Sequence, residues 1–254
     1  DGLGYEFLMK YGKGTVFNKN LIGKMTSVFP SSTSAAIPAF MTGDSPKEHG
    51  MTGWWMFSKE FGCQIIPLPF ISRIKNNKKL GELIPISSLF NIKPFYNKIN
   101  IKSYVVQKEE IINSHFTITA SGKAKRISYN SLKSFVKNIA RLSKKPGKKY
   151  IWAYYSDHDS LCHKYGYNHK KVLTHFKKLN KQMSTLLKLI KNTDTMLIVT
   201  SDHGCINIPE NKRIELKNHP KLRECLSIPL CGEHRFAYCY VKSNKEKEFK
   251  KYIK

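Results

Sequence analysis

Two Asp–His pairs are the side chains of this sequence best suited to bind a metal ion. Asp159 and His163 lie four residues apart, so a loop or a first helical turn can direct both at one ion. Asp202 and His203 directly follow a hydrophobic run. Carboxylates mixed with imidazoles suit Zn²⁺ or Mn²⁺ better than Ca²⁺. Two such ions a few Å apart can stabilise both the attacking and the leaving oxygen of an in-line displacement.

A run of hydroxyls, Ser-Ser-Thr-Ser at 31–34, precedes a small-residue apolar run that Gly43 ends. This pattern predicts a helix start with hydroxyl caps and exposed backbone N–H groups. Residue types alone do not choose among the four hydroxyls, since each could serve as a cap. Asp1 opens the chain in Asp-Gly-Leu-Gly, a small-residue turn suited to a strand end. We expect the strand it would end to lie upstream, and the chain to be a fragment cut at both ends.

The elements that would position these residues alternate along the second half of the chain. Helical spacing of apolar residues predicts helices over 130–145 and 169–191. Short apolar runs predict strands over 150–155, 195–200 and 236–241, the second of them buried. The alternation predicts parallel strands with helices on both faces. Ligands of such sheets bind beyond the carboxyl ends of the strands, and both Asp–His pairs fall there.

The chain carries a net charge of +26. Only six of its 44 basic residues are Arg, and the lysines are spread along the chain, so sequence-specific nucleic-acid binding is not expected. The charge predicts a general attraction for anionic substrates. The sequence contains no run of 18 apolar residues, so it predicts no transmembrane helix. Its first residues lack a signal-peptide pattern. Six scattered cysteines without a CxxC pair suit a reducing compartment and slightly favour the cytoplasm.

Four motifs, taken in order, resemble a known family. They are Asp-Gly at 1–2, Phe-Pro-Ser-Ser-Thr…Met-Thr-Gly-Asp-Ser-Pro-Lys-Glu-His-Gly at 29–50, Asp-Ser-Leu-Cys-His-Lys-Tyr-Gly at 159–166 and Ser-Asp-His-Gly at 201–204. Together they resemble the alkaline phosphatase superfamily and, within it, the nucleotide pyrophosphatase/phosphodiesterase (type I phosphodiesterase) group. The resemblance spans essentially the whole chain and is weakest over 58–125.

The resemblance implies an α/β fold, an alkaline-phosphatase-like sandwich with a largely parallel central sheet, helices on both faces and a small cap insertion. We expect a single catalytic domain over 1–254. Prolines interrupt the pattern between about 58 and 125. We therefore interpret this stretch as a cap over a site rather than as core sheet.

The resemblance also implies two divalent metal ions, zinc first and Mn²⁺ as the alternative. Asp159, His163 and a further histidine would bind one ion. The further histidine is His219, in Lys-Asn-His-Pro, or His234, in Gly-Glu-His-Arg. The resemblance favours His219, because related sequences keep a His-Pro at this place. The ligands implied for the other ion are Asp1, Thr33, Asp202 and His203.

The family spacing, ten residues before Gly43, implies that Thr33 is the nucleophile. Metal coordination lowers the pKa of such a hydroxyl, and a helix N-terminus would bind phosphoryl oxygens. Attack would form a phospho-threonine, which water then hydrolyses. Phosphodiesterases of the group often carry Asn three residues after the nucleophile, where this chain has Ala36. No Arg follows Thr33 to grip a monoester dianion, and this gap favours diesters.

The implied activity is hydrolysis of phosphodiester or pyrophosphate bonds in a small phosphoester or nucleotide. A phosphomonoesterase or a phosphonate or lipid-head-group hydrolase with the same site is the alternative among enzymes. Outside enzymes, the alternative is a basic protein that binds nucleic acid or membrane surfaces on a decayed hydrolase scaffold. That alternative predicts missing ligands, whereas the motif positions carry Asp and His throughout. The sequence indicates neither substrate-binding residues nor an oligomeric state.

Overall fold

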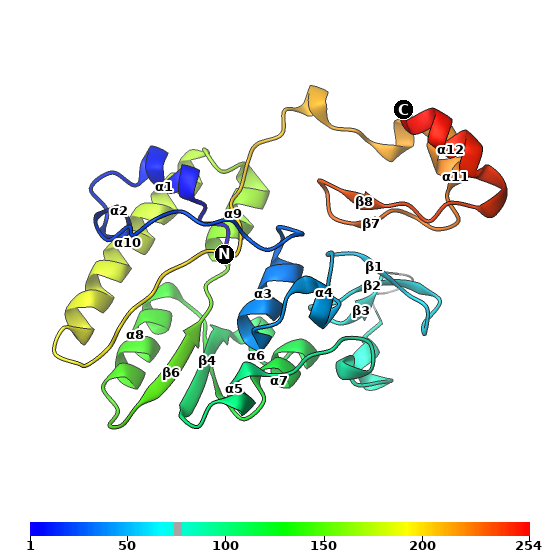
Figure 1. The fold of residues 1–254 in the computed structure, drawn as a ribbon. Helices are drawn as coiled ribbons and strands as arrows, with labels where there is room; N and C mark the ends of the chain where they lie inside the picture. Colours follow the sequence, from blue (N-terminus) through cyan, green and yellow to red (C-terminus); the bar gives the residue numbers. More distant parts are fainter. Residues whose placement is uncertain (74–77) are drawn as a thin grey trace.

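A three-stranded parallel sheet forms the centre of the computed structural model, which describes residues 1–73 and 78–254 (Figure 1). Its strands are β4 (Lys102–Lys108), β5 (Lys125–Tyr129) and β6 (Lys149–Ala153), in the order β5-β4-β6. Both pairs of neighbours are parallel. The middle of β4, Tyr104-Val105-Val106, is almost fully buried, as expected for a strand covered on both faces.

Helices cover both faces of this sheet, which confirms the predicted α/β class (Figure 1). Val105 packs in one core cluster with side chains of α3 (Thr33–Thr42) and α7 (His115–Ser121). Its neighbours Tyr104 and Val106 pack in a second cluster with α8 (Leu132–Ser143) and α10 (Lys170–Ile190). This division follows from the two-residue period of a strand, which sends alternate side chains to opposite faces.

Most of the predicted elements are confirmed. The helix predicted over 130–145 is α8, the helix predicted over 169–191 is α10, and the strand predicted over 150–155 is β6. The helix expected after the hydroxyl run is α3, and Gly43 ends it at φ 79° in the left-handed region that favours glycine. Of the strand predicted over 236–241, two residues pair as β8 (Ala237–Tyr238).

Two expectations are wrong. The stretch 58–125 was expected to lie outside the core sheet, but β4 is the middle strand of that sheet. The apolar run of β4 is short, so it gave a weak strand signal. Its position in the middle of the sheet results from pairing with β5 on one side and β6 on the other. The segment 195–200 was expected to be a buried strand, but it has no strand pairing among the described residues, and Met196 is 86% exposed. Leu197 packs against the cluster beside α10, so only part of this apolar run reaches the core.

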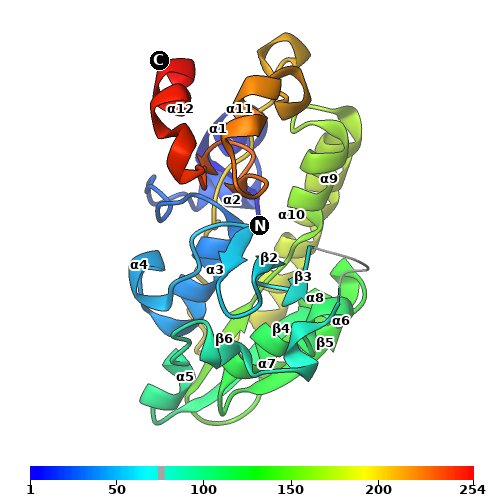
Figure 2. The same cartoon turned by 90° about the vertical axis from the view of Figure 1, so that its right-hand side faces the viewer.

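A second sheet is antiparallel, with the order β1-β2-β3, and its strands β2 and β3 lie near the middle of the view in Figure 2; α4 spans Pro46–His49. The hairpin of β7 and β8 adjoins this second sheet, because Trp55 and Gly232 exchange backbone hydrogen bonds of 3.1 and 2.6 Å. The strands of this second sheet and of the hairpin are β1 (Met56–Ser58), β2 (Cys63–Ile66), β3 (Ile71–Ser72) and β7 (Cys231–Gly232).

The single catalytic domain and the cap insertion remain predictions.

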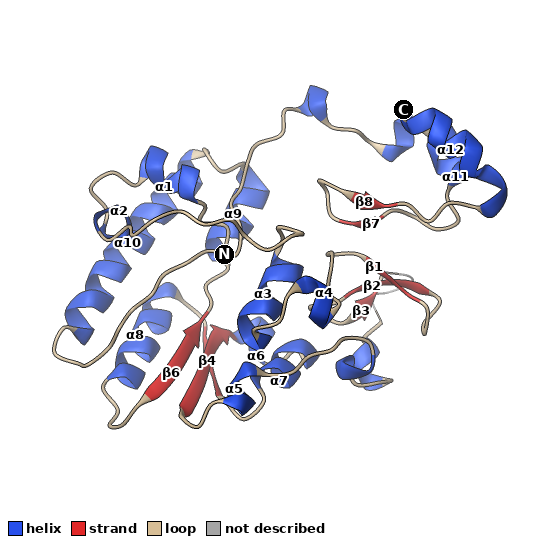
Figure 3. Cartoon of the chain, in the orientation of Figure 1, coloured by secondary structure: helices blue, strands red, loops and turns tan. Residues whose placement is uncertain are grey.

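Short helices and long loops make up the rest of the described residues (Figure 3). Among the described residues, no helix is both long and apolar enough to cross a membrane. The remaining helices are α1 (Tyr5–Tyr11), α2 (Val16–Lys19), α5 (Phe95–Lys98), α6 (Glu109–Ile112), α9 (Asp157–Tyr165), α11 (Pro220–Cys225) and α12 (Glu246–Ile253).

Candidate metal centre

The first half of the candidate site lies beyond the carboxyl end of β6. The chain turns there into α9, whose first turn carries Asp159. His163 follows one turn later on the same helix face, and its Nε2 lies 3.3 Å from Asp159 Oδ2. The helical spacing that the sequence suggested is therefore real, and it brings a buried carboxylate and an imidazole together.

The second half is a group of three side chains from distant parts of the chain. The Nε2 atom of His203 lies 3.4 Å from Asp1 Oδ1 and 3.5 Å from Asp202 Oδ2. The potential ligand atoms of these three residues all lie within 4.8 Å of one another. The backbone N–H of Gly2 donates to Asp202 Oδ1 at 3.1 Å, and the hydroxyl of Tyr154 donates to Asp1 Oδ2. Both carboxylates are therefore held in fixed orientations.

Two carboxylate oxygens of this group are left for a cation. Asp1 Oδ1 and Asp202 Oδ2 are buried and have no hydrogen-bond partner among the described residues. Burial of an unpaired carboxylate oxygen costs free energy unless a hydrogen bond or a cation compensates for it. Both oxygens face the same imidazole nitrogen. Two carboxylates and an imidazole form a donor set that fits Zn²⁺ or Mn²⁺.

Thr33 completes the group, and it begins α3. Its Oγ1 lies 3.0 Å from His203 Nε2. The hydroxyls of Ser32 and Ser34 are buried and have no hydrogen-bond partner among the described residues, and Ser31 is exposed. Tertiary structure thus distinguishes four hydroxyls that the sequence left equivalent, because it brings the hydroxyl of Thr33 against His203.

The charges of the site shift the pKa values of its imidazoles upward. Burial lowers the pKa of His203, but a hydrogen bond with Cys205 and the charge of Asp202 outweigh it and raise the pKa to about 9. The hydrogen bond with Asp159 raises the pKa of His163. Burial raises the pKa of Asp159, but its hydrogen bond with His163 outweighs this and keeps the pKa low.

Close packing of glycines allows these loops to meet. A Cβ on Gly4 would lie 2.7 Å from the Cα of Gly204, a distance that real Cβ atoms essentially never show. Gly2 has φ +70°, and a Cβ there would lie 2.9 Å from Asp159. Only glycine therefore lets the turn at the chain start lie against both the Asp-His-Gly loop and α9.

The structure does not bring the predicted third histidine to Asp159. His219 precedes α11, and its Nδ1 lies 2.8 Å from the hydroxyl of Tyr252 on α12. His234 packs edge-on against Trp55, with ring centroids 4.9 Å apart. Neither histidine belongs to a group of three potential ligands within the described residues. The role assigned to His219 remains a prediction.

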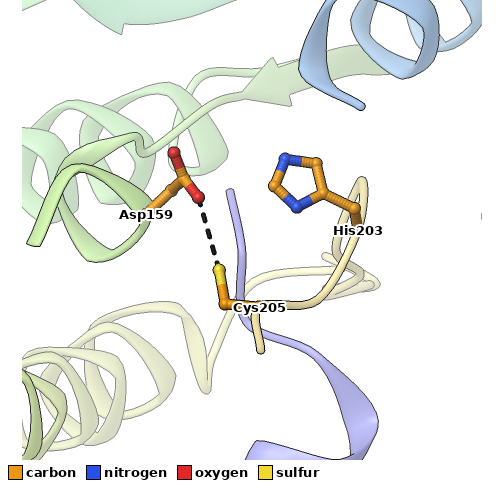
Figure 4. Close-up of side chains that lie close together, drawn as sticks. All are labelled: Asp159, His203 and Cys205. Atoms are coloured by element: carbon orange, nitrogen blue, oxygen red, sulfur yellow. Dashed lines mark hydrogen bonds between the residues drawn. The ribbon is translucent and has the colours of Figure 1, made fainter. Parts of the chain in front are cut away.

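Cys205 is the site residue that the sequence reasoning missed. Its Sγ donates to Asp159 Oδ1 at 3.4 Å, and the ligand atoms of Asp159, His203 and Cys205 lie within 4.8 Å of one another (Figure 4). The signal was its position two residues after His203, in the same loop. The sequence analysis had used the cysteines only to infer a compartment.

A parallel sheet covered by helices, with Asp159 and His163 beyond the carboxyl end of β6 and the group of Asp1, Asp202 and His203 beside them, is the arrangement expected of the alkaline phosphatase superfamily, a class of metal-dependent hydrolases. The sequence model of the type I phosphodiesterase / nucleotide pyrophosphatase family matches residues 3–63 and 76–252. The chain belongs to that family, and it is a hydrolase of phosphoric esters. A comparison with curated protein sequences found no significant match.

Two solved structures of one murine protein share the fold. Murine ectonucleotide pyrophosphatase / phosphodiesterase 5 superposes with a TM-score of 0.69 at 17% identity, over 100% of this chain and 68% of that one. An inactive variant of the same murine protein in complex with AMP gives a TM-score of 0.68 at 17% identity, over 100% and 67% of the two chains. Phosphonoacetate hydrolase from Sinorhizobium meliloti 1021 matches over 74% of this chain and 52% of that one, at 13% identity and a TM-score of 0.44.

Proposed function

We propose that this chain hydrolyses phosphodiester or pyrophosphate bonds of a small phosphoester, such as a nucleotide, through a phospho-threonine at a two-metal site. One observation carries the proposal. The hydroxyl of Thr33 lies at the N-terminus of α3, 3.0 Å from the His203 Nε2 that faces Asp1 and Asp202. The proposed nucleophile and the two carboxylates thus lie around one imidazole nitrogen, and the imidazole is itself a third potential metal ligand. The AMP complex of the murine relative supports a nucleotide as substrate.

Thr33 takes part in both steps of the proposed reaction. Thr33 Oγ1 loses its proton and attacks phosphorus, while the bond from phosphorus to the leaving-group oxygen breaks and that oxygen takes up a proton. Water then attacks the phospho-threonine, and Oγ1 leaves and is reprotonated. Free N–H groups at the start of α3 would bind phosphoryl oxygens.

The proposed ligands divide between two ions. Asp1, Asp202, His203 and Thr33 would bind one ion, and Asp159 and His163 would bind the other. Zn²⁺ is the ion that carboxylate and imidazole ligands suit best, with Mn²⁺ as the alternative. When bound, such ions lower the pKa of a hydroxyl and offset the charge of the phosphoryl group.

Tyr154 has a supporting part. Its hydroxyl donates to Asp1 Oδ2, and burial raises its pKa, so it stays protonated at neutral pH. This hydrogen bond occupies Oδ2 of Asp1 and leaves Oδ1 directed at His203 Nε2. This arrangement orients a carboxylate ligand before any ion binds.

The test compares turnover of bis-p-nitrophenyl phosphate with turnover of p-nitrophenyl phosphate. The chain is assayed with Zn²⁺, with a chelator, and as Thr33→Ala, with the exposed Ser31→Ala as the matched control. We expect diester turnover that the chelator abolishes and that Thr33→Ala lowers by roughly a thousandfold or more. Ser31→Ala should leave turnover unchanged. Turnover that survives both the chelator and Thr33→Ala would refute the mechanism, and a preference for the monoester would refute the substrate assignment.

A further inference from the structure

We propose that Cys205 is a ligand, through its sulfur, of the divalent ion that Asp159 would bind. The inference rests on the proposed two-metal site and assigns a residue that the family motifs do not contain. It starts from a missing third ligand. Asp159 and His163 are only two ligands, and the histidine expected as the third contacts Tyr252.

The carboxylate of Asp159 lies between two donors. His163 Nε2 lies 3.3 Å from Oδ2, and Cys205 Sγ lies 3.4 Å from Oδ1. The imidazole of His163 and the thiol of Cys205 therefore approach different oxygens of the same carboxylate. Among the described residues, Cys205 shares a group of potential ligand atoms within 4.8 Å with Asp159 and His203, and His163 contacts Asp159 from outside that group. Figure 4 shows the sulfur directed at Asp159, with the ring of His203 on the other side of the same space.

The neighbouring groups independently point to a cation at this place. His203 lies within 4.8 Å of both Asp159 and Cys205, measured between ligand atoms. The same His203 faces Asp1 Oδ1 and Asp202 Oδ2, which are buried without a hydrogen-bond partner among the described residues. A thiol, an imidazole and a carboxylate together form a known type of zinc donor set. On coordination the thiol proton would leave to solvent.

The backbone fixes the position of Cys205. Gly204 packs directly against Gly4, where any side chain on Gly4 would collide with it. The next residue is thereby placed against α9, beside Asp159. Rigid placement of a ligand by its surroundings is what a metal site requires.

Cys162 provides a matched control, because it lies one residue before His163 on the same helix. Its thiol is buried in the cluster of Phe7, Val172 and Phe176, and its Sγ lies 3.8 Å from His158 Nε2. Its thiol also forms a hydrogen bond with the thiol of Cys205, so replacing it tests which of two neighbouring sulfurs binds the ion.

The experiment loads the metal-free chain with Co²⁺ and records near-ultraviolet absorption, where thiolate-to-cobalt charge transfer appears, together with the bound cobalt. We expect the charge-transfer band in the unmodified chain and in Cys162→Ser, and its loss in Cys205→Ser and Cys205→Ala. Zn²⁺ affinity should fall at least about tenfold in both Cys205 variants, since even residues that only orient a ligand have effects of that size. Circular dichroism checks that each variant folds.

Bound cobalt without the band in the unmodified chain, or a band that persists in a folded Cys205 variant, would overturn the proposal. Failure of the unmodified chain to bind cobalt would overturn it as well. Diester turnover of the unmodified chain separates this inference from the proposed function. Turnover that depends on a chelatable metal and on Thr33, without the band, rejects only the Cys205 ligand. A Cys205-dependent band without turnover rejects only the proposed reaction.

Discussion

The Nε2 atom of His203 lies 3.0 Å from the hydroxyl of Thr33, although 170 positions separate the two residues in the sequence. The loop that carries the Asp-His-Gly motif at 202–204 brings the imidazole, and the start of α3 brings the hydroxyl. Asp1 and Asp202 face the same nitrogen from two further segments. This convergence is the basis of the predictions that follow.

A covalent intermediate should be detectable on Thr33. If its hydroxyl attacks phosphorus, acid quenching during diester turnover should trap one phosphate on the peptide that contains Thr33. Mass spectrometry of the digested chain locates the modification. Phosphate found on Ser32 or Ser34 instead would assign the nucleophile to a different hydroxyl, and Thr33→Ser should retain a trapped intermediate because it keeps the hydroxyl.

The stability of the metal-free chain should fall as pH rises through about 9. The pKa of His203 is raised in the folded state from a usual value of 6.5 to about 9. Protonated His203 therefore stabilises the fold fully below about pH 6.5, and this contribution is lost as pH rises through about 9. It amounts to roughly 3 kcal/mol. Urea unfolding of the chelator-treated chain at several pH values measures it, and an equally steep loss in His203→Gln would contradict the assignment.

Asp202→Asn should weaken zinc binding and lower the pKa of His203. The amide keeps an oxygen that can accept from Gly2 N–H, but it removes the negative charge that raises the pKa of this imidazole. We expect zinc affinity to fall at least about tenfold. NMR titration of the His203 ring in the metal-free protein measures the pKa. An unchanged pKa would show that Asp202 does not act on His203 electrostatically.

Gly4→Ala should damage the site without touching a ligand. The added Cβ would lie 2.7 Å from the Cα of Gly204, so the loop that carries Asp202 and His203 must move. Overpacking of this kind destabilises a protein by about 1–3 kcal/mol. Thermal unfolding and zinc titration check both effects. Gly23→Ala is the matched control, since nothing lies within 4 Å of a Cβ there.

Local patterns in the sequence predicted the structural features that depend on residues close together in the chain. The apolar period of α10, the small-residue run of α3 and the four-residue spacing of Asp159 and His163 each fix which side chains share a face. Each holds in the structure, because helix geometry alone sets these relationships. The motif order indicated the superfamily in the same way, through residues that lie close together within each motif.

Only the tertiary structure decided what depends on contacts between distant segments. A short apolar run becomes a strand when neighbours pair with it, so β4 joins the sheet and 195–200 does not. Four adjacent hydroxyls look alike in sequence, and only the approach of His203 distinguishes Thr33. Cys205 meets Asp159 because Gly4 lets two loops pack closely. These relationships come from the folding of remote segments onto one another, which no local spacing encodes.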